Sequence, residues 1–294
     1  MNRRNWLLRA GMAVGAWAPQ SPLLAALATD EGYRANIGLQ LYTIRKAIEA
    51  DPVAAMRVLA QACYQQVEPY GFMQADAMMR AARDAGLAVH SAHFQWDCVV
   101  KPSDAGMSDF QKVLEKANAQ KLKHLVVPYL QDEVRRGLDD YKKLADQFNQ
   151  AAVLAKKAGV QLSYHNHNFE FAPLEGGKSG YDVFMERFAP EMKFEVDVFW
   201  VKVAGLEPVE LLQRLKGRVS QLHLKDLKAG IACPYYKTDV PADAFQELGN
   251  GVIAMLPIIA AARLAGVEHC HVEQDQSPDA LVSVQQSLKW LRQQ

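Results

Sequence analysis

Eight short apolar runs constrain the fold of this chain most strongly. Each run is followed by polar residues and then by a longer stretch with helical spacing. The runs lie at residues 37–42, 66–69, 88–93, 124–128, 161–165, 193–197, 219–224 and 269–273. Between several of them, apolar residues recur as on one face of an α-helix, at 52–63, 75–85, 141–158, 208–215, 254–265 and 278–291. A glycine, the usual residue after a helix C-terminus, precedes the next run at positions 86, 159, 217 and 266. The pattern predicts eight strand–helix units.

Eight such units in about 260 residues match the size of a (β/α)8 barrel, which typically has ~250 residues. An open, doubly wound parallel sheet is the alternative. That fold is disfavoured because no G-x-G-x-x-G motif follows an early strand and no linker divides the chain into halves. We therefore predict an α/β protein, a single-domain (β/α)8 TIM barrel over residues 29–294.

The first 28 residues have the three-part layout of an export signal. Arg3 and Arg4 precede a short apolar run at 10–18, and small residues at 26–28 suit a signal peptidase. The paired arginines favour the twin-arginine route, and a periplasmic or otherwise exported protein is expected. An amphipathic first helix is the alternative, but two prolines interrupt the segment and no polar face recurs.

Charge and hydropathy exclude two classes of partner. The chain has 33 basic and 33 acidic residues, and without the first 28 residues it has 30 against 33. No field of one sign therefore favours nucleic acid, and no run of about 18 apolar residues predicts a membrane span. The four cysteines form no C-x-x-C motif and stand mostly in apolar runs, which predicts reduced core thiols rather than disulfides.

Polar residues collect where the predicted strands end, and in a barrel this end carries the active site. Residues two apart on a strand share a face, so His165 and His167 point the same way, as do His223 and Lys225. The last four strands offer a mixed set of nitrogen and carboxylate donors: His165, Asp197, His223 and Glu273. Such donors suit one divalent ion, Mn²⁺, Zn²⁺, Co²⁺, Fe²⁺ or Mg²⁺, better than Ca²⁺.

The strand-end motifs follow one another in the order seen in xylose isomerase-like TIM barrels. They read IGLQLYTIR, VEPYG, SAH, YHNHNFEF, FEVDVFWVKVAG, LHLKD, ELGNGVI and HVEQD. Over essentially the whole chain after the export signal, the sequence resembles the sugar phosphate isomerase/epimerase branch of that superfamily. The resemblance implies a single barrel that holds one divalent ion, with Asp197, His223 and Glu273 at the metal positions of the last three strands.

The fifth strand departs from this resemblance. Many sugar epimerases of the superfamily carry Glu where this chain has His165, and in them a pair of metal-bound glutamates moves the proton between the two faces of an enediolate. Here only Glu273 of that pair is present. His165 either replaces the ligand, or acts as the base while His167 or water completes the coordination of the metal.

The implied reaction is loss of a proton from the carbon beside a sugar carbonyl. The candidate catalytic residues are His165, His167, Glu273 and Lys225, with Lys225 neutralising the developing oxyanion. Return of the proton to the neighbouring carbon gives an isomerase, and return to the opposite face gives an epimerase. Expulsion of a group β to the carbonyl gives a lyase, for example one that releases the aglycone of a 3-keto-glycoside.

Other strand-end residues are assigned to the substrate, a small-molecule carbohydrate. Glu68 and His93 are expected to bind sugar hydroxyls together with Lys225, and Trp200 to stack on a sugar face with Trp96 and Phe199. The alternative for Glu68 is an ion pair with Arg45, and for the aromatic residues a place in the core.

The sequence disfavours two other functions. Apurinic endonucleases share this superfamily, but the acidic balance after the export signal opposes DNA binding. A non-catalytic periplasmic sugar-binding barrel is opposed by the intact set of metal-binding residues. Whether the protein forms a homo-oligomer stays open.

Overall fold

The computed structural model describes residues 30–103 and 106–294, so the predicted export signal lies outside the described residues. Eight parallel strands form the core of the chain, each inside one of the apolar runs identified in the sequence or displaced from it by one residue. They are β1 (Gly38–Gln40), β2 (Val67–Glu68), β3 (Ser91–His93), β4 (His124–Val127), β5 (Gln161–His165), β6 (Met192–Asp197), β7 (Val219–Leu224) and β10 (His269–Val272).

The strands are arranged in the order β2-β1-β10-β7-β6-β5-β4-β3, with neighbours paired in parallel. A parallel bridge between Gln66 and Ala88 joins the two ends of this order, just before β2 and β3 begin. The sheet is thereby a nearly closed barrel. The predicted (β/α)8 fold is confirmed.

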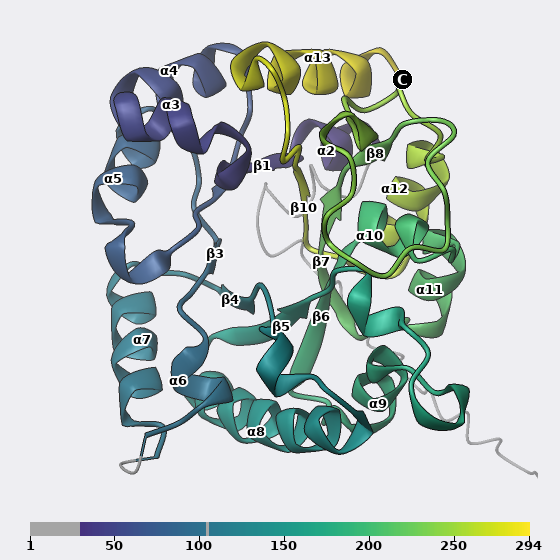
Figure 1. Cartoon of the computed structure of the whole chain (residues 1–294). Helices are drawn as coiled ribbons and strands as arrows, with labels where there is room; N and C mark the ends of the chain where they lie inside the picture. Colours follow the sequence, from purple (N-terminus) through teal and green to yellow (C-terminus); the bar gives the residue numbers. More distant parts are fainter. Residues whose placement is uncertain (1–29, 104–105) are drawn as a thin grey trace, which may run out of the picture.

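The helices form an outer ring around the strands (Figure 1). Those anticipated in the sequence are α4 (Pro52–Gln61), α5 (Asp76–Asp84), α8 (Leu138–Lys157), α11 (Pro208–Arg214), α12 (Met255–Leu264) and α13 (Ala280–Gln293). The glycines predicted to follow four helices have positive φ angles between 74° and 82°, a conformation that costs glycine little. Further helices are α2 (Asp30–Ala35), α3 (Arg45–Ala50), α6 (Asp97–Val100), α7 (Ser108–Ala119), α9 (Gly180–Arg187) and α10 (Val198–Val203).

Aromatic side chains fill the layer between the barrel and the helices beside β5. Tyr164 of β5 packs against Phe184 of α9 and Phe148 of α8, with ring centroids 4.9 and 5.6 Å apart. These rings are fully buried, and such a cluster contributes through its large apolar area. It fixes β5 against its helices and so positions His165 at the end of that strand.

A short antiparallel pair, which the sequence pattern did not reveal, follows the seventh barrel strand. It consists of β8 (Asp226–Leu227) and β9 (Phe245–Gln246). The carboxylate of Asp226 accepts hydrogen bonds from the backbone N–H groups of Gly249, Gly251 and Ile253 at 2.9–3.0 Å. A Cβ atom at Gly251 would collide with Asp226. Asp226 therefore fixes the loop before α12.

The expectation that the four cysteines lie in the core is wrong for Cys63 and Cys233, while Cys98 packs against the core from its edge. Cys270 is buried, whereas Cys98 is half-buried and Cys63 and Cys233 are exposed. Cys63 lies in the turn after α4 with a φ of 72°, so the apolar run around it ends at the surface. Within residues 30–103 and 106–294, no helix has the length and apolar character needed to cross a membrane.

Candidate active site

The four side chains predicted to bind a metal come together at the C-terminal end of the barrel. They come from four consecutive barrel strands: His165 ends β5, Asp197 ends β6, His223 lies near the end of β7 and Glu273 follows β10. One donor atom from each lies within 4.8 Å of the donor atoms of all the others. His223 Nδ1 is 2.8 Å from Glu273 Oε2, and His165 Nε2 is 3.4 Å from Asp197 Oδ2. All four residues are buried.

The orientation of Asp197 is set by the helix that begins after it. Asp197 is the N-cap of α10, and its Oδ1 accepts hydrogen bonds from the backbone N–H groups of Phe199 and Trp200 at 2.9 and 3.1 Å. Such a cap satisfies N–H groups that have no partner inside the helix. The second oxygen, Oδ2, makes no hydrogen bond and faces His165. One carboxylate therefore starts a helix with one oxygen and offers the other to the site.

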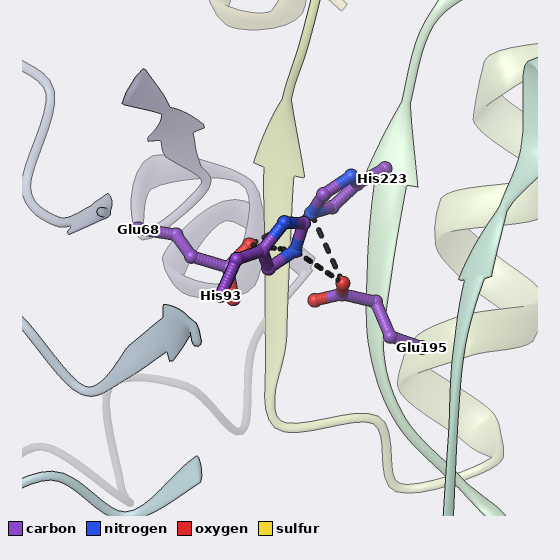
Figure 2. Close-up of side chains that lie close together, drawn as sticks. All are labelled: Glu68, His93, Glu195 and His223. Atoms are coloured by element: carbon purple, nitrogen blue, oxygen red, sulfur yellow. Dashed lines mark hydrogen bonds and ion pairs between the residues drawn. The ribbon is translucent and has the colours of Figure 1, made fainter. Parts of the chain in front are cut away.

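Two carboxylates orient His223 from below (Figure 2). Its Nε2 lies 2.7 Å from Glu68 Oε2 and 3.3 Å from Glu195 Oε2, and His93 Nε2 lies 2.9 Å from the same Glu195 oxygen. Burial and Glu195 oppose ionisation of Glu68, yet His271, His93 and His223 lower its pKa to about 2. A carboxylate only accepts hydrogen bonds, so Nε2 of His223 carries the proton. Burial opposes protonation of the His223 ring, but Glu195 and Glu273 raise its pKa well above the usual value. An ion bound at Nδ1 would therefore displace the proton that this atom shares with Glu273 Oε2.

Glu68 lies beneath the site rather than in the wall of the cavity above it. It is fully buried, accepts a hydrogen bond from Gln40 at 3.0 Å and a further one from the Ser91 hydroxyl. Arg45 does not pair with it and donates instead to the carbonyl oxygens of Tyr42 and Asp275. The geometry favours a role for Glu68 in orienting His223 over contact with substrate.

The donor atoms that face one another fit a divalent ion. The four facing atoms, His165 Nε2, Asp197 Oδ2, His223 Nδ1 and Glu273 Oε2, are buried, and the two carboxylate oxygens pair with Lys225 and the ring nitrogens. Buried carboxylates need compensating positive charge, and a bound cation would supply more of it. Two imidazole nitrogens and two carboxylate oxygens form a donor set that transition-metal ions accept.

Lys225 places a positive charge beside this donor set. Its Nζ lies 2.8 Å from Glu273 Oε2, 3.0 Å from Asp197 Oδ2 and 3.1 Å from Asp275 Oδ2. Burial alone would lower the pKa of Lys225, but these three carboxylates raise it well above its usual value. Burial raises the pKa of Asp275 to about 7. Lys225 is thus a fixed cation.

A cavity of about 720 Å³ opens above the donor set. Its polar floor contains His93, His165, His167, Lys225 and Glu273. Aromatic residues form much of its wall, namely Tyr42, Tyr70, Trp96, Tyr129, Trp200 and Phe245. Phe199, expected in this wall, is instead fully buried and stacks on Phe245.

His167 projects into the same cavity from the turn after β5. Its ring stacks on Phe169 and meets the ring of Tyr129 edge-on, with centroids 5.5 and 5.0 Å apart. Burial, followed by His165 and Lys225, holds the pKa of His167 well below its usual value, so the ring is neutral near pH 7. Glu170, whose pKa burial raises to about 7, accepts hydrogen bonds from the backbone N–H of His167 and from the Tyr164 hydroxyl. The turn that carries His167 is therefore anchored in the core.

Sequence reasoning missed Glu195 and Gln221, which lie one layer below the donor set. Gln221 donates to Glu195 Oε1 and to Ser91 Oγ at 3.0 Å, so the layer forms one buried polar network. The sequence did contain a signal for both residues. Each stands two positions before a predicted ligand on the same strand, so its side chain faces the same way as that ligand.

Comparison with known proteins places this geometry in a family. Residues 46–294 match the family model described as xylose isomerase-like TIM barrel. The chain belongs to this family. A crystal structure of a sugar phosphate isomerase/epimerase from Parabacteroides distasonis has a similar fold, with a TM-score of 0.71 at 23% identity, covering 87% of this chain and 96% of that one.

The chain is also similar to two further proteins, one in sequence and one in fold. An inosose dehydratase from Geobacillus kaustophilus is 27% identical over 128 residues, which cover 41% of this chain and 41% of the relative. The match thus spans less than half of that relative's length. A crystal structure described as the IOLI protein with a bound zinc atom has a TM-score of 0.63 at 13% identity, covering 86% of this chain and 95% of that one.

Proposed function

We propose that this xylose isomerase-like barrel is a divalent-metal-dependent enzyme that removes a proton beside the carbonyl of a sugar or keto-sugar. The product would be an isomerised or epimerised sugar. One observation carries the proposal: four buried donor atoms converge on one point beneath a cavity that also holds a fixed cation, Lys225. His165, Asp197, His223 and Glu273 would hold the ion.

Each polar group on the floor of the cavity has a role in this proposal. A divalent ion, when bound, would act as a Lewis acid toward the carbonyl oxygen and an adjacent hydroxyl oxygen. Glu273 or the neutral ring of His167 would accept the proton from carbon; alternatively His165 would be the base while His167 or water takes its place at the ion. Lys225 would stabilise the negative charge that develops on the substrate oxygen. The aromatic wall, including Trp96 and Trp200, would stack on a face of the sugar.

A lyase is the second candidate, and His165 favours it. A two-glutamate proton shuttle needs a second carboxylate where β5 presents His165, whereas elimination needs one base and one acid. The relative from Geobacillus is named as a dehydratase, a class that eliminates water. In a 3-keto-glycoside, the base would take the proton from C2 and the electron pair would form the C1=C2 double bond. The C1–O bond would break, and the aglycone oxygen would take a proton from an acid or water.

Proton exchange in deuterated water tests both candidates. The enzyme, loaded with Mn²⁺ or Zn²⁺, is incubated with ketoses and with 3-keto-glycosides, and the products are followed by NMR. We expect deuterium on the carbon beside the carbonyl of the true substrate. A new sugar isomer or epimer identifies the first candidate, and free aglycone identifies the lyase.

Enzyme stripped with a chelator serves as the control and should exchange no proton, with activity returning on addition of the ion. Sugar binding without exchange by the loaded enzyme would contradict both candidates. It would favour the non-catalytic sugar-binding barrel.

We also propose that residues 1–28 direct twin-arginine export to the periplasm. Changing both Arg3 and Arg4 to Lys should leave the precursor in the cytoplasm, as measured by cell fractionation. The matched control is Arg9→Lys, which lies outside the pair and should be exported normally. Export of a chain that lacks residues 1–28 would show that this segment is not the signal.

A further inference from the structure

A second group of metal-binding side chains lies at the opposite end of the barrel from the cavity. His124 is the first residue of β4, His269 is the first residue of β10 and Glu268 directly precedes it. In the strand order, three strands separate β4 from β10 in either direction, so the two histidines face each other across the lumen. Their ring centroids are 5.4 Å apart.

The three side chains have the spacing of a metal site. One donor atom each from His124, Glu268 and His269 lies within 4.8 Å of the other two, and His124 Nε2 is 3.4 Å from Glu268 Oε2. His90 stacks on the His269 ring, with centroids 4.9 Å apart and an angle of 11° between the planes. This stacking holds the His269 ring in place without using a donor atom of the group.

Two ring nitrogens of this group lack partners that a purely structural role would supply. His124 is only 2% exposed, and while its Nε2 faces Glu268 Oε2, neither its Nδ1 nor Nδ1 of His269 makes a hydrogen bond. Burial of polar atoms without hydrogen bonds is costly, and branched apolar residues usually fill this layer of a (β/α)8 barrel.

Solvent reaches the group from outside the barrel. The Glu268 side chain is 65% exposed, and both His124 and Glu268 line a cavity of about 500 Å³ at this end. Lys123 and Lys156 also line it, so the surroundings do not form an acidic patch that attracts cations without selection. Selectivity would rest on the two imidazoles.

We propose that His124, His269 and Glu268 bind a second divalent ion of the zinc type, separate from the ion at the cavity. Two imidazole nitrogens and one carboxylate oxygen form a common zinc donor set, with a fourth position left to water. Such an ion would link β4 to β10 across the lumen. It would therefore stabilise the closed barrel rather than take part in catalysis at the other end.

Metal counting tests this site. The full chain is dialysed against Zn²⁺, the bound ions are counted by atomic emission, and thermal unfolding is followed with and without Zn²⁺. We expect two ions in the unaltered protein and one in His124→Gln or Glu268→Gln. In these variants the Zn²⁺-dependent rise in Tm should shrink. Glu268 is exposed, so its replacement leaves the core packing intact and the count stays interpretable if His124→Gln fails to fold.

Two further variants separate the sites. His223→Ala should lose the ion at the cavity and retain the ion at His124, Glu268 and His269. His90→Ala alters the layer around His269 without removing a donor atom and should retain both ions. The proposal is overturned if His124→Gln and Glu268→Gln bind as many ions as the unaltered protein with unchanged affinity. It is also overturned if the unaltered protein binds one ion that His223→Ala abolishes. If the unaltered protein bound one ion that His124→Gln abolished and His223→Ala did not, the proposed enzyme would be contradicted and this second site would stand.

Discussion

Glu273→Gln is expected to lose the active-site ion and to reduce turnover by about 10³-fold, since a bound divalent ion contributes several kcal/mol to transition-state stabilisation. Glu273 Oε2 is ion-paired at 2.8 Å with both His223 Nδ1 and Lys225 Nζ. The amide keeps the shape of the side chain but removes its negative charge. His223→Ala should have an effect of similar size because it removes a nitrogen donor. Metal content by atomic emission and the rate of proton exchange measure the result.

Two other glutamate substitutions serve as comparisons for the loss of metal and turnover in Glu273→Gln. Glu68→Gln should weaken metal affinity by roughly 10- to 100-fold, the usual effect of changing a group that orients a ligand, because Glu68 holds the proton on Nε2 of His223. Glu175→Gln alters an exposed loop residue and should change neither metal content nor turnover. Retention of both metal and turnover by Glu273→Gln and His223→Ala would show that the assigned metal centre is wrong.

The sequence was sufficient to place the strands and the residues at their ends. Each strand is short and apolar, and two-residue periodicity decides which side chains face the lumen. His165 and Glu273 could therefore be grouped from the pattern alone, although their role as ligands stays a prediction. Phe199 was misplaced because it lies on helix α10 rather than on a strand, and five of the six α10 residues are apolar and buried, so no periodicity indicates which residue turns inward.

Contacts between distant strands could not be predicted in this way. Glu68 and His223 are 155 positions apart, and whether Glu68 faces substrate or His223 depends on the stagger of β2 against β7. In the same way, His124 and His269 come into contact only because the barrel closes. Their strands do not pair with each other, because β10 pairs with β7 and β4 with β3. The local sequence pattern determines which way a side chain faces, and the order of the strands determines which distant residue it contacts.

Lys225→Met is expected to retain the active-site ion while reducing turnover by about 10²- to 10³-fold, the usual loss when one group that stabilises an oxyanion is removed. Lys225 Nζ contacts Asp197 Oδ2 and Glu273 Oε2, two oxygens that would also bind the ion, so its removal leaves those oxygens free for the metal. The third partner, Asp275, is accommodated because burial already raises its pKa to about 7. Without the neighbouring ammonium it can take up a proton and remain buried as a neutral acid.

Separate measurement of metal and rate distinguishes the two roles open to Lys225. A group that stabilises developing charge lowers kcat when it is lost, and metal affinity stays the same or rises. A group that only balances the three carboxylates would instead leave kcat unchanged in Lys225→Met and alter stability alone, which would contradict the assignment. Lys202→Met is the matched control, because Lys202 pairs with Glu207 outside the cavity and its loss should leave both metal and rate unchanged. The contrast between the two lysines therefore shows whether the cation at the barrel mouth acts on the substrate.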